Sequence, residues 1–335
     1  MKIHYTTGES ATMSLSQTST SKVLKKLSRD YSVVFALALL VCFFAIIAPT
    51  FLRFNNIMNI LLQTTTISLV AIGQASLLLT GQLDLSLGQN VCLSGMVSAY
   101  LMEFANFSPW IALLFGVLTG SLVGLCNGLI FTKIGIPAFI TTLGMMNVCR
   151  GLAKLITSTK TIAPLSKSIE VLGRGYIFDT IPVSVLIMLA FYILMSFIFS
   201  RTTLGRSFYS VGGNVEASFF AGINTDKIYI IAFTLAGMFA GISSGILISR
   251  LNSANIGNGN AYEFEAMIGC VIGGISQKGG KGKILGAMLG VMFSVALFNG
   301  MTILNVNSFL QDLFKGVVLL GAMAVDVLRN RKQKV

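Results

Sequence analysis

The sequence is divided into about ten apolar runs, most of them close to twenty residues long and separated by short polar links. Hydrophobic residues make up 54% of the chain and charged residues 11%. A helical run of this length spans the hydrocarbon layer of a bilayer and satisfies its own backbone hydrogen bonds there. The pattern predicts an all-α integral membrane protein with about ten transmembrane helices. The predicted spans are 31–49, 56–80, 85–104, 109–131, 136–157, 182–200, 227–249, 264–275, 283–304 and 308–327.

Two of these spans are irregular. Span 264–275 is short for a full crossing, and the region 79–87 is interrupted by Gly81, Gln82 and Asp84. Short and discontinuous helices often mark the working centre of a transporter. We therefore expect some of the helices to be broken inside the membrane.

Glycine recurs at every fourth position in three spans, which places the glycines of each span on one helix face and predicts close packing of helix backbones. An Asn-Gly pair also ends the fourth span (Asn127) and the ninth span (Asn299), which indicates two related halves. The periodic glycines are Gly116, Gly120, Gly124 and Gly128, then Gly237, Gly241 and Gly245, then Gly282, Gly286 and Gly290.

An even number of spans places both ends of the chain on the same side of the membrane. Both ends are rich in Lys and Arg, which are enriched in cytoplasmic segments. The sequence thus predicts a disordered cytoplasmic tail over 1–30, a transmembrane domain over 31–328 and a basic cytoplasmic tail over 329–335. The same count places the link 201–226 inside the cell. The basic link 158–181 falls outside, against the charge rule.

Several classes of function lack the residues they need. The only histidine is His4, and the five cysteines lie in apolar runs without a CxxC pair, so neither a metal site nor a cofactor is predicted. The stretch GGISQKGGKGKILG from Gly273 fails the GxxxxGK[ST] pattern of a phosphate-binding loop, and the chain is not predicted to be an ATPase or another enzyme. The net charge of +12 is concentrated in links and tails, which favours contact with membrane lipid over nucleic acid.

The motif LTGQLDLSLGQN from Leu79 contains a carboxylate between two apolar runs. Ser86 and Gln89 have the spacing of a capping box, so we expect a helix to begin at Ser86, with Asp84 just before it. An ionised group in such a place is costly and often functional. We favour a structural role for Asp84 and Ser86 at this helix start over direct contact with a substrate.

The motif IPAFITTLGMMNVCRG from Ile136 places one aromatic ring and several uncharged polar groups inside a span. Such a lining suits a neutral polyol, which needs stacking and hydroxyl partners but no counter-charge. Hydrogen bonds to neighbouring helices explain the same residues equally well. The candidates for a translocation pathway are Phe139, Thr141, Thr142 and Asn147, with Gln63 and Gln74 in the second span.

The polar link 201–226 is longer than a chain reversal requires. Gly212 and Gly213 are expected to form a turn, and Asn214 is expected to begin a short amphipathic helix that runs through Phe219 and Phe220. Exposed aromatic rings beside charges fit a groove on a partner protein. A helix resting on lipid headgroups is the alternative.

Several blocks, in order, give the chain a resemblance to a known family over about 35–326. They are LTGQLDLSLG, IPAFITTLGMMNVCRG, RTTLGRSFYSVGGNVEASFFAGIN, YEFEAMIGCVIGGISQKGGKGKILGAMLG, FNG and LFKGVVLLGAMAVD. The chain resembles the permease subunit of ribose-type ATP-binding-cassette importers, a family that includes permeases for ribose, xylose, galactose and autoinducer-2. It departs from the family pattern in TGQLDLS, where SGIDLS or GGIDLS is usual, and in SANIGNGN after the seventh span.

The resemblance implies a pore of two permease chains, ATPase subunits beneath it and an external substrate-binding protein above it. It also implies that the link 201–226 carries the helix that couples the pore to the ATPase. The alternatives are a transporter driven by an ion gradient and an importer of the same class for nucleosides. The residues that match the coupling motif are Gly205, Arg206, Gly212, Gly213, Asn214, Glu216, Ala217 and Gly222.

Overall fold

The computed structural model describes residues 32–331. The predicted disordered tail over 1–30 lies outside the described residues, as does most of the predicted tail over 329–335. The last helix, α14, runs to Arg331 and so extends slightly past the predicted boundary at residue 328.

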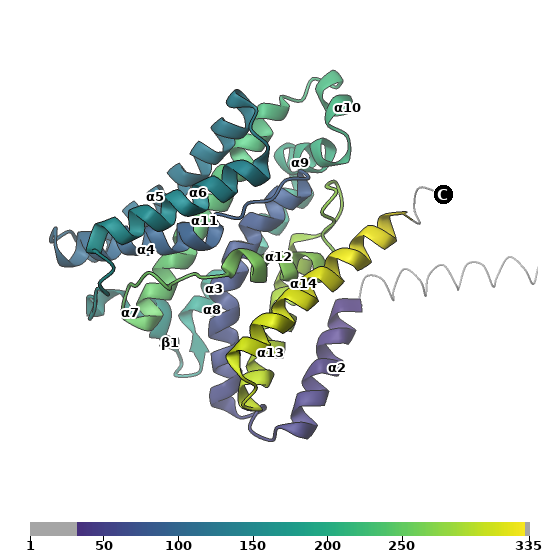
Figure 1. Ribbon diagram of the computed structural model, residues 1–335. Coiled ribbons are helices and arrows are strands. Elements are labelled where there is room, and N and C mark those ends of the chain that lie inside the picture. Colours follow the sequence, from purple (N-terminus) through teal and green to yellow (C-terminus); the bar gives the residue numbers. More distant parts are fainter. Residues whose placement is uncertain (1–31, 332–335) are drawn as a thin grey trace, which may run out of the picture.

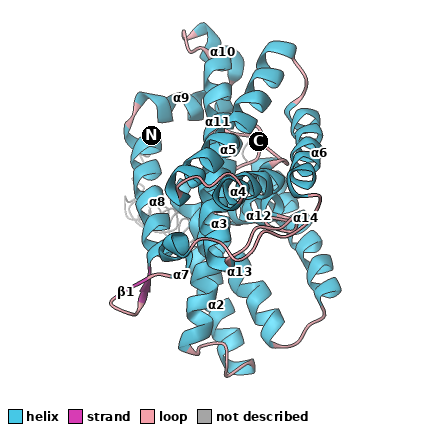
Figure 2. Ribbon diagram, turned by 90° about the vertical axis from the view of Figure 1, so that its left-hand side faces the viewer, coloured by secondary structure: helices cyan, strands magenta, loops and turns pink. Residues whose placement is uncertain are grey.

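The described chain is almost entirely helical (Figures 1 and 2). Two strands, β1 and β2, form a small antiparallel hairpin. The longer helices are α2 (Ser32–Ile47), α3 (Phe54–Leu79), α4 (Leu87–Glu103), α5 (Pro109–Leu129), α6 (Ala138–Thr157), α8 (Val183–Arg201), α9 (Thr203–Gly213), α11 (Thr225–Leu251), α12 (Tyr262–Ile272), α13 (Ile284–Ile303) and α14 (Ser308–Arg331). The short elements are a π-helical turn (Ile130–Ile134), a 3-10 turn (Lys167–Ile169), α7 (Glu170–Arg174), β1 (Tyr176–Ile177), β2 (Ile181–Pro182) and α10 (Val215–Phe220).

A helix lies at each of the predicted spans, and the expectation of an all-α membrane protein is confirmed. Among the described residues, six helices are long and apolar enough to cross a membrane, and Val33–Ile47 is a shorter apolar helix. Helix α12 has only 11 residues. At 1.5 Å per residue it covers about 16 Å, roughly half of a hydrocarbon layer. The six long apolar helices are Phe54–Leu79, Pro109–Ile134, Val183–Arg201, Thr225–Leu251, Ile284–Ile303 and Ser308–Leu328.

The core is built around α11, which packs against both α3 and α5. It runs antiparallel to α3, because the Ser243 hydroxyl donates to the carbonyl of Thr66 at 2.8 Å while Ala236 lies against Gly73, seven residues further along α3. The predicted glycine faces of α5 and α11 meet directly. A β-carbon on Gly241 would lie 2.7 Å from the α-carbon of Val117, which is too close for any side chain to fit without movement. The two backbones are therefore in contact, as the glycine spacing predicts.

The order of elements repeats along the chain. A long helix (α3 or α11) is followed by a non-helical link, a helix that starts after it (α4 or α12), a glycine-spaced helix (α5 or α13) and a further helix (α6 or α14). Asn127 and Asn299 fall near the ends of the equivalent helices α5 and α13, in agreement with the two related halves that the Asn-Gly pairs indicate. Since α3 and α11 are antiparallel, the halves have opposite directions, an arrangement common in transporters.

The molecule has two distinct ends (Figures 1 and 2). Helices α9 and α10 lie at one end, and α7 with the β1 hairpin lies toward the other. The last turns of α14 reach the α9 end, where the backbone N–H of Gln277 donates to the Asp326 carboxylate at 3.2 Å. Helix α2 ends far from α9, because Phe44 packs against Gly300 near the opposite end of α13. The start of α2 and the end of α14 therefore both lie toward the end of the molecule that carries α9.

Candidate functional site

Helix α9 is amphipathic and begins at a defined cap. The Thr202 side chain accepts a hydrogen bond from the Gly205 N–H at 3.2 Å, so the chain can turn sharply after α8. A β-carbon on Gly205 would lie 2.5 Å from the Ile198 carbonyl, which explains the glycine at this turn. The side chains of Phe208 and Val211 are buried against the bundle, whereas Arg206 is exposed.

Helix α10 confirms the predicted short helix. Asn214 has an extended backbone, and its side-chain oxygen accepts a hydrogen bond from the Ala217 N–H at 2.9 Å. Glu216 stands in the first turn, where a negative charge is favoured by the helix dipole. The rings of Phe219 and Phe220 are 65% and 78% exposed, so the tip of the molecule presents bare aromatic surface.

The expectation of a turn at Gly212 and Gly213 is wrong. Both residues lie in the last turn of α9, and neither has a positive φ. The change of direction occurs instead at Asn214, which starts α10. Gly212 is required for close packing, because a β-carbon there would overlap the carbonyl oxygen of Leu79, whereas Gly213 has open space. Gly222 alone among the four loop glycines has the left-handed conformation, with φ +81°.

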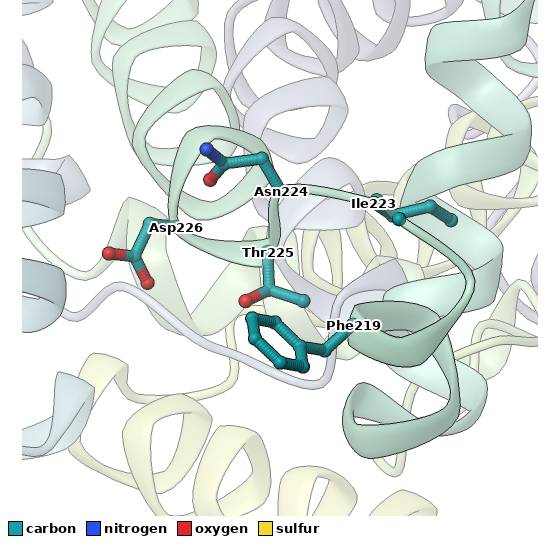
Figure 3. A pocket seen from close by; sticks show the side chains of 6 residues that line it. Phe219, Ile223, Asn224, Thr225 and Asp226 are labelled. Carbon is teal, nitrogen blue, oxygen red and sulfur yellow. The ribbon is translucent and has the colours of Figure 1, made fainter.

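A cavity of about 390 Å³ opens beside α10. In Figure 3 the Phe219 ring lies next to the Thr225 side chain at its wall. The Asn224 side chain caps α11 by accepting from the Lys227 N–H at 2.9 Å, and Asp226 pairs with Lys133 at 2.9 Å. The lining residues are Phe219, Gly222, Ile223, Asn224, Thr225 and Asp226. Aromatic, amide and carboxylate groups in one open recess can receive an element of another protein.

A second polar cluster lies inside the protein, at the start of α4. The buried Asp84 carboxylate accepts from the Ser86 N–H at 2.7 Å, from the Ser86 hydroxyl at 2.6 Å and from the Asn127 amide at 3.1 Å. The predicted capping box between Ser86 and Gln89 is not formed, because the Ser86 hydroxyl is held by Asp84 and Asn127. The Asp84 carboxylate thus bonds to the residue just before α4 and to α5, and its favoured structural role stays a prediction.

Sequence reasoning missed Glu263, at the start of α12. It is only 4% exposed, and its Oε2 atom has no hydrogen-bond partner among the described residues. The carboxylate lies over Gly88 in the first turn of α4, where a β-carbon would overlap it. The starts of α4 and α12 therefore lie next to each other inside the fold. The available signal was a pair of glutamates, Glu263 and Glu265, at the start of the shortest apolar run.

The pathway candidates do not gather in one place. Phe139 is 54% exposed and Asn147 is exposed, both on the outer surface of α6, while Thr141 and Thr142 are buried. The Thr142 hydroxyl donates to the Ala138 carbonyl at 2.9 Å, and the Asn147 amide donates to the Leu143 carbonyl at 3.1 Å. Within residues 32–331, both side chains therefore bond inside their own helix and not to a neighbouring one.

The two glutamines of α3 differ in burial. Gln63 is half-buried, whereas Gln74 is fully buried and its two amide atoms have no partner among the described residues. A buried amide without partners costs free energy unless another group or water satisfies it. Gln74 is therefore the pathway candidate with the most unmet hydrogen-bonding capacity.

Comparison with known proteins gives a consistent result along nearly the whole chain. A family model described as branched-chain amino acid transport system / permease component matches residues 56–323. The ribose import permease protein of Bacillus subtilis (strain 168) is 36% identical over 292 residues, which cover 87% of this chain and 90% of that protein. No solved structure matches the chain.

Two further relatives come from Escherichia coli (strain K12). The L-arabinose transport system permease protein is 33% identical over 302 residues, which cover 90% of this chain and 91% of that protein. The D-allose transport system permease protein is 32% identical over 303 residues, with 90% and 92% covered. The match to the family model and the sequence identity to these relatives show that the chain belongs to this family of transport-system permease components and is a multi-pass protein of the inner membrane.

Proposed function

We propose that this chain is the membrane-spanning subunit of an ATP-driven importer for a small neutral sugar or a sugar-like solute. Three relatives are named for the transport of ribose, allose and arabinose, all uncharged sugars rich in hydroxyl groups. The pathway candidates are uncharged polar or aromatic side chains, which suit such a cargo. The cargo class rests on these relatives, because the description of the family model refers to amino acids.

The observation that carries the proposal is the surface formed by α9 and α10. The sequence contains no phosphate-binding loop, so another subunit would bind and hydrolyse the ATP. The α9–α10 surface presents Phe219 and Phe220 at its tip with Arg206 and Glu216 exposed beside them. Exposed aromatic anchors next to charged groups are typical of protein interfaces. The ATPase subunit would bind here.

The distribution of basic residues supports a cytoplasmic position for this end. Lys and Arg are enriched in the cytoplasmic parts of membrane proteins. The basic residues at the α9–α10 end are Lys133, Arg201, Arg206, Lys227, Lys278, Lys281 and Lys283. On this orientation the link 158–181, with its β1 hairpin, faces outward and is the largest surface available to an external binding protein.

A single chain does not enclose the pathway candidates, because Phe139 and Asn147 lie on its outer surface. A second permease chain, identical or different, would face this surface and complete the pore. ATP binding in the ATPase subunit would then shift the two permease chains between inward-open and outward-open states, through contacts that differ between the two states. A transporter driven by an ion gradient would need no ATPase subunit.

The test removes the aromatic tip. We expect the double variant Phe219→Ala, Phe220→Ala to insert normally but to lose its ATPase chain on affinity purification. An anchor of this kind contributes about 2 kcal/mol or more, so the loss of even one of the two rings lowers the affinity at least about thirtyfold. The control is Phe309→Ala in the first turn of α14, far from the α9–α10 surface, where the ring is 80% exposed. Retention of the ATPase by the double variant, or uptake driven by a proton or sodium gradient with no ATPase present, would contradict the proposal.

A further inference from the structure

Three backbones from distant parts of the sequence meet beside α9. The Gly280 N–H donates to the carbonyl of Leu79, the last residue of α3, at 2.9 Å. A β-carbon on Gly212 would overlap that same carbonyl oxygen and lie 2.6 Å from the Gly280 nitrogen. A β-carbon on Gly279 would lie 2.6 Å from the Gly212 carbonyl oxygen. We call Leu79, Gly212, Gly279 and Gly280 the glycine junction.

The loop 276–283, the second part of the link between α12 and α13, is closed by its own backbone. Gly279 and Gly280 have φ values of +83° and +70°, which favour glycine. The Ser276 N–H donates to the Lys281 carbonyl at 3.0 Å, and this bond closes the loop on itself. Because the loop is closed in this way, a movement of α9 would shift the loop as a unit and not only deform it.

Tyr209 adds a second contact between α9 and this loop. Its hydroxyl donates to the Gly282 carbonyl at 2.9 Å. A phenol is protonated at neutral pH and able to donate, and burial raises the pKa of Tyr209 further. Helix α9 thus contacts the loop both through its backbone at Gly212 and through a side chain one turn earlier.

The two ends of α10 are attached differently to the bundle. At its start, Asn214 joins it directly to α9 and the glycine junction. At its end, Gly222 has φ +81° and no atom within 4 Å of the position of a β-carbon. Of the two connections, the one through α9 leads directly to the glycine junction. A displacement of α10 therefore reaches the junction through α9.

Beyond the loop, α12 leads to the interior of the protein. It has 11 residues, and its first turn carries Glu263, whose carboxylate lies over Gly88 at the start of α4. Close-packed backbones cannot approach each other further, so a movement of α9 toward α3 must shift the loop and with it α12. A path of contacts therefore links the exposed tip of α10 to the place where α4 and α12 start.

We propose that the glycine junction transmits the movement of α9 to α12, and that Gly212 and Tyr209 are positioning residues for ATP-driven transport. This rests on the proposed function, because the movement originates in the ATPase bound at α10. Gly212 acts by holding the backbones in contact, and Tyr209 acts by holding the loop to α9. Neither residue is assigned a contact with the cargo.

The experiment uses the complete importer with its ATPase chain, reconstituted in lipid. A spin label is attached at position 264, where Phe264 is 41% exposed on the first turn of α12. Cys42 and Cys126, the two exposed cysteines, are replaced by serine. The line shape of the label is compared without nucleotide and after trapping with ATP and vanadate. The variants are Gly212→Ala, Tyr209→Phe and the control Gly321→Ala on α14, where a β-carbon meets nothing within 4 Å.

We expect all variants to retain the ATPase chain, because α10 is unchanged. The ATP-dependent change at position 264 should fall at least about tenfold in Gly212→Ala, within the range of coupling between two sites. It should fall about fivefold in Tyr209→Phe, which is the contribution of one hydrogen bond. Gly321→Ala should respond as the unmodified chain does.

A normal response in Gly212→Ala, or in Tyr209→Phe if the first variant does not insert, overturns the inference. An unmodified importer that binds its ATPase but shows no change at position 264 overturns it as well. Failure of the unmodified chain to retain any ATPase would instead refute the proposed function. The two failures are therefore distinguishable.

Discussion

The packing of α5 against α11 leads to a matched pair of substitutions in one glycine face. Gly241 and Gly245 are one turn apart on α11, and both are buried. A β-carbon on Gly241 would lie 2.7 Å from the Val117 α-carbon and 3.0 Å from the Gly116 carbonyl oxygen. A β-carbon on Gly245 would meet only a methyl group of Leu113, at 3.3 Å. The same change to alanine therefore tests backbone contact against side-chain contact.

The structure sets the size of the effect. For Gly241→Ala, the backbone of α5 must move by about 0.7 Å to reach the 3.4 Å of ordinary contact. A gap of 0.5–1 Å removes about a quarter to a half of the dispersion energy of the atoms that separate. Overpacking of this kind costs about 1–3 kcal/mol, and the gain in helix propensity returns up to about 1 kcal/mol. We expect a net loss of about 1–2 kcal/mol in the free energy of unfolding. For Gly245→Ala, the Leu113 side chain can rotate, and we expect no loss.

The assay is thermal unfolding in detergent, followed with a dye that becomes fluorescent on reaction with thiols. Cys92, Cys149 and Cys270 are free and buried, so they react only as the protein unfolds. Cys42 and Cys126 are exposed and are replaced by serine to lower the background. The melting temperature of Gly241→Ala should fall by about 2–8 °C, on the scale of large domains.

The comparison of the two variants can refute the reasoning directly. If Gly241→Ala melts within about 1 °C of Gly245→Ala, α5 and α11 are not in backbone contact at this position. If the melting temperature falls more in Gly245→Ala than in Gly241→Ala, the tight contact lies at Gly245 and the reasoning is refuted.

Two further substitutions test buried polar groups, with the same melting assay. Asp84→Asn leaves one acceptor oxygen where the carboxylate has two, so the bonds from Ser86 and Asn127 can no longer all be made as they are, and we expect a loss of about 1–3 kcal/mol. Asn127→Asp in the same chain should partly restore this loss, and no recovery in the double variant would contradict the pairing. Tyr192→Phe removes the hydrogen bond that the buried hydroxyl donates to the Ser68 carbonyl at 2.9 Å, and we expect a loss of about 1 kcal/mol with normal insertion, whereas an unchanged melting temperature would show that this bond contributes nothing to stability.

Local signals explain what was predictable. An apolar run of bilayer length predicts a helix, because a single segment in lipid can satisfy its backbone N–H and C=O groups only by forming one. The helix at α10 was predicted from Asn214 because an N-cap acts on amides only three residues away, within one turn. The glycine faces of α5 and α11 were visible because the period of a helix places every fourth residue on one side. Each of these signals lies within a single element.

The sequence by itself thus determined the class of fold, the positions of the ten predicted spans and the exposed aromatic tip of α10. Only the tertiary structure decided which polar groups meet, because that depends on the relative positions of elements far apart in the chain. The Ser86 hydroxyl bonds Asp84 and Asn127 instead of capping its own helix. Gly212 serves a contact with Leu79 and Gly280 that no local pattern encodes, since three separate backbones must be in place before the absence of a side chain matters.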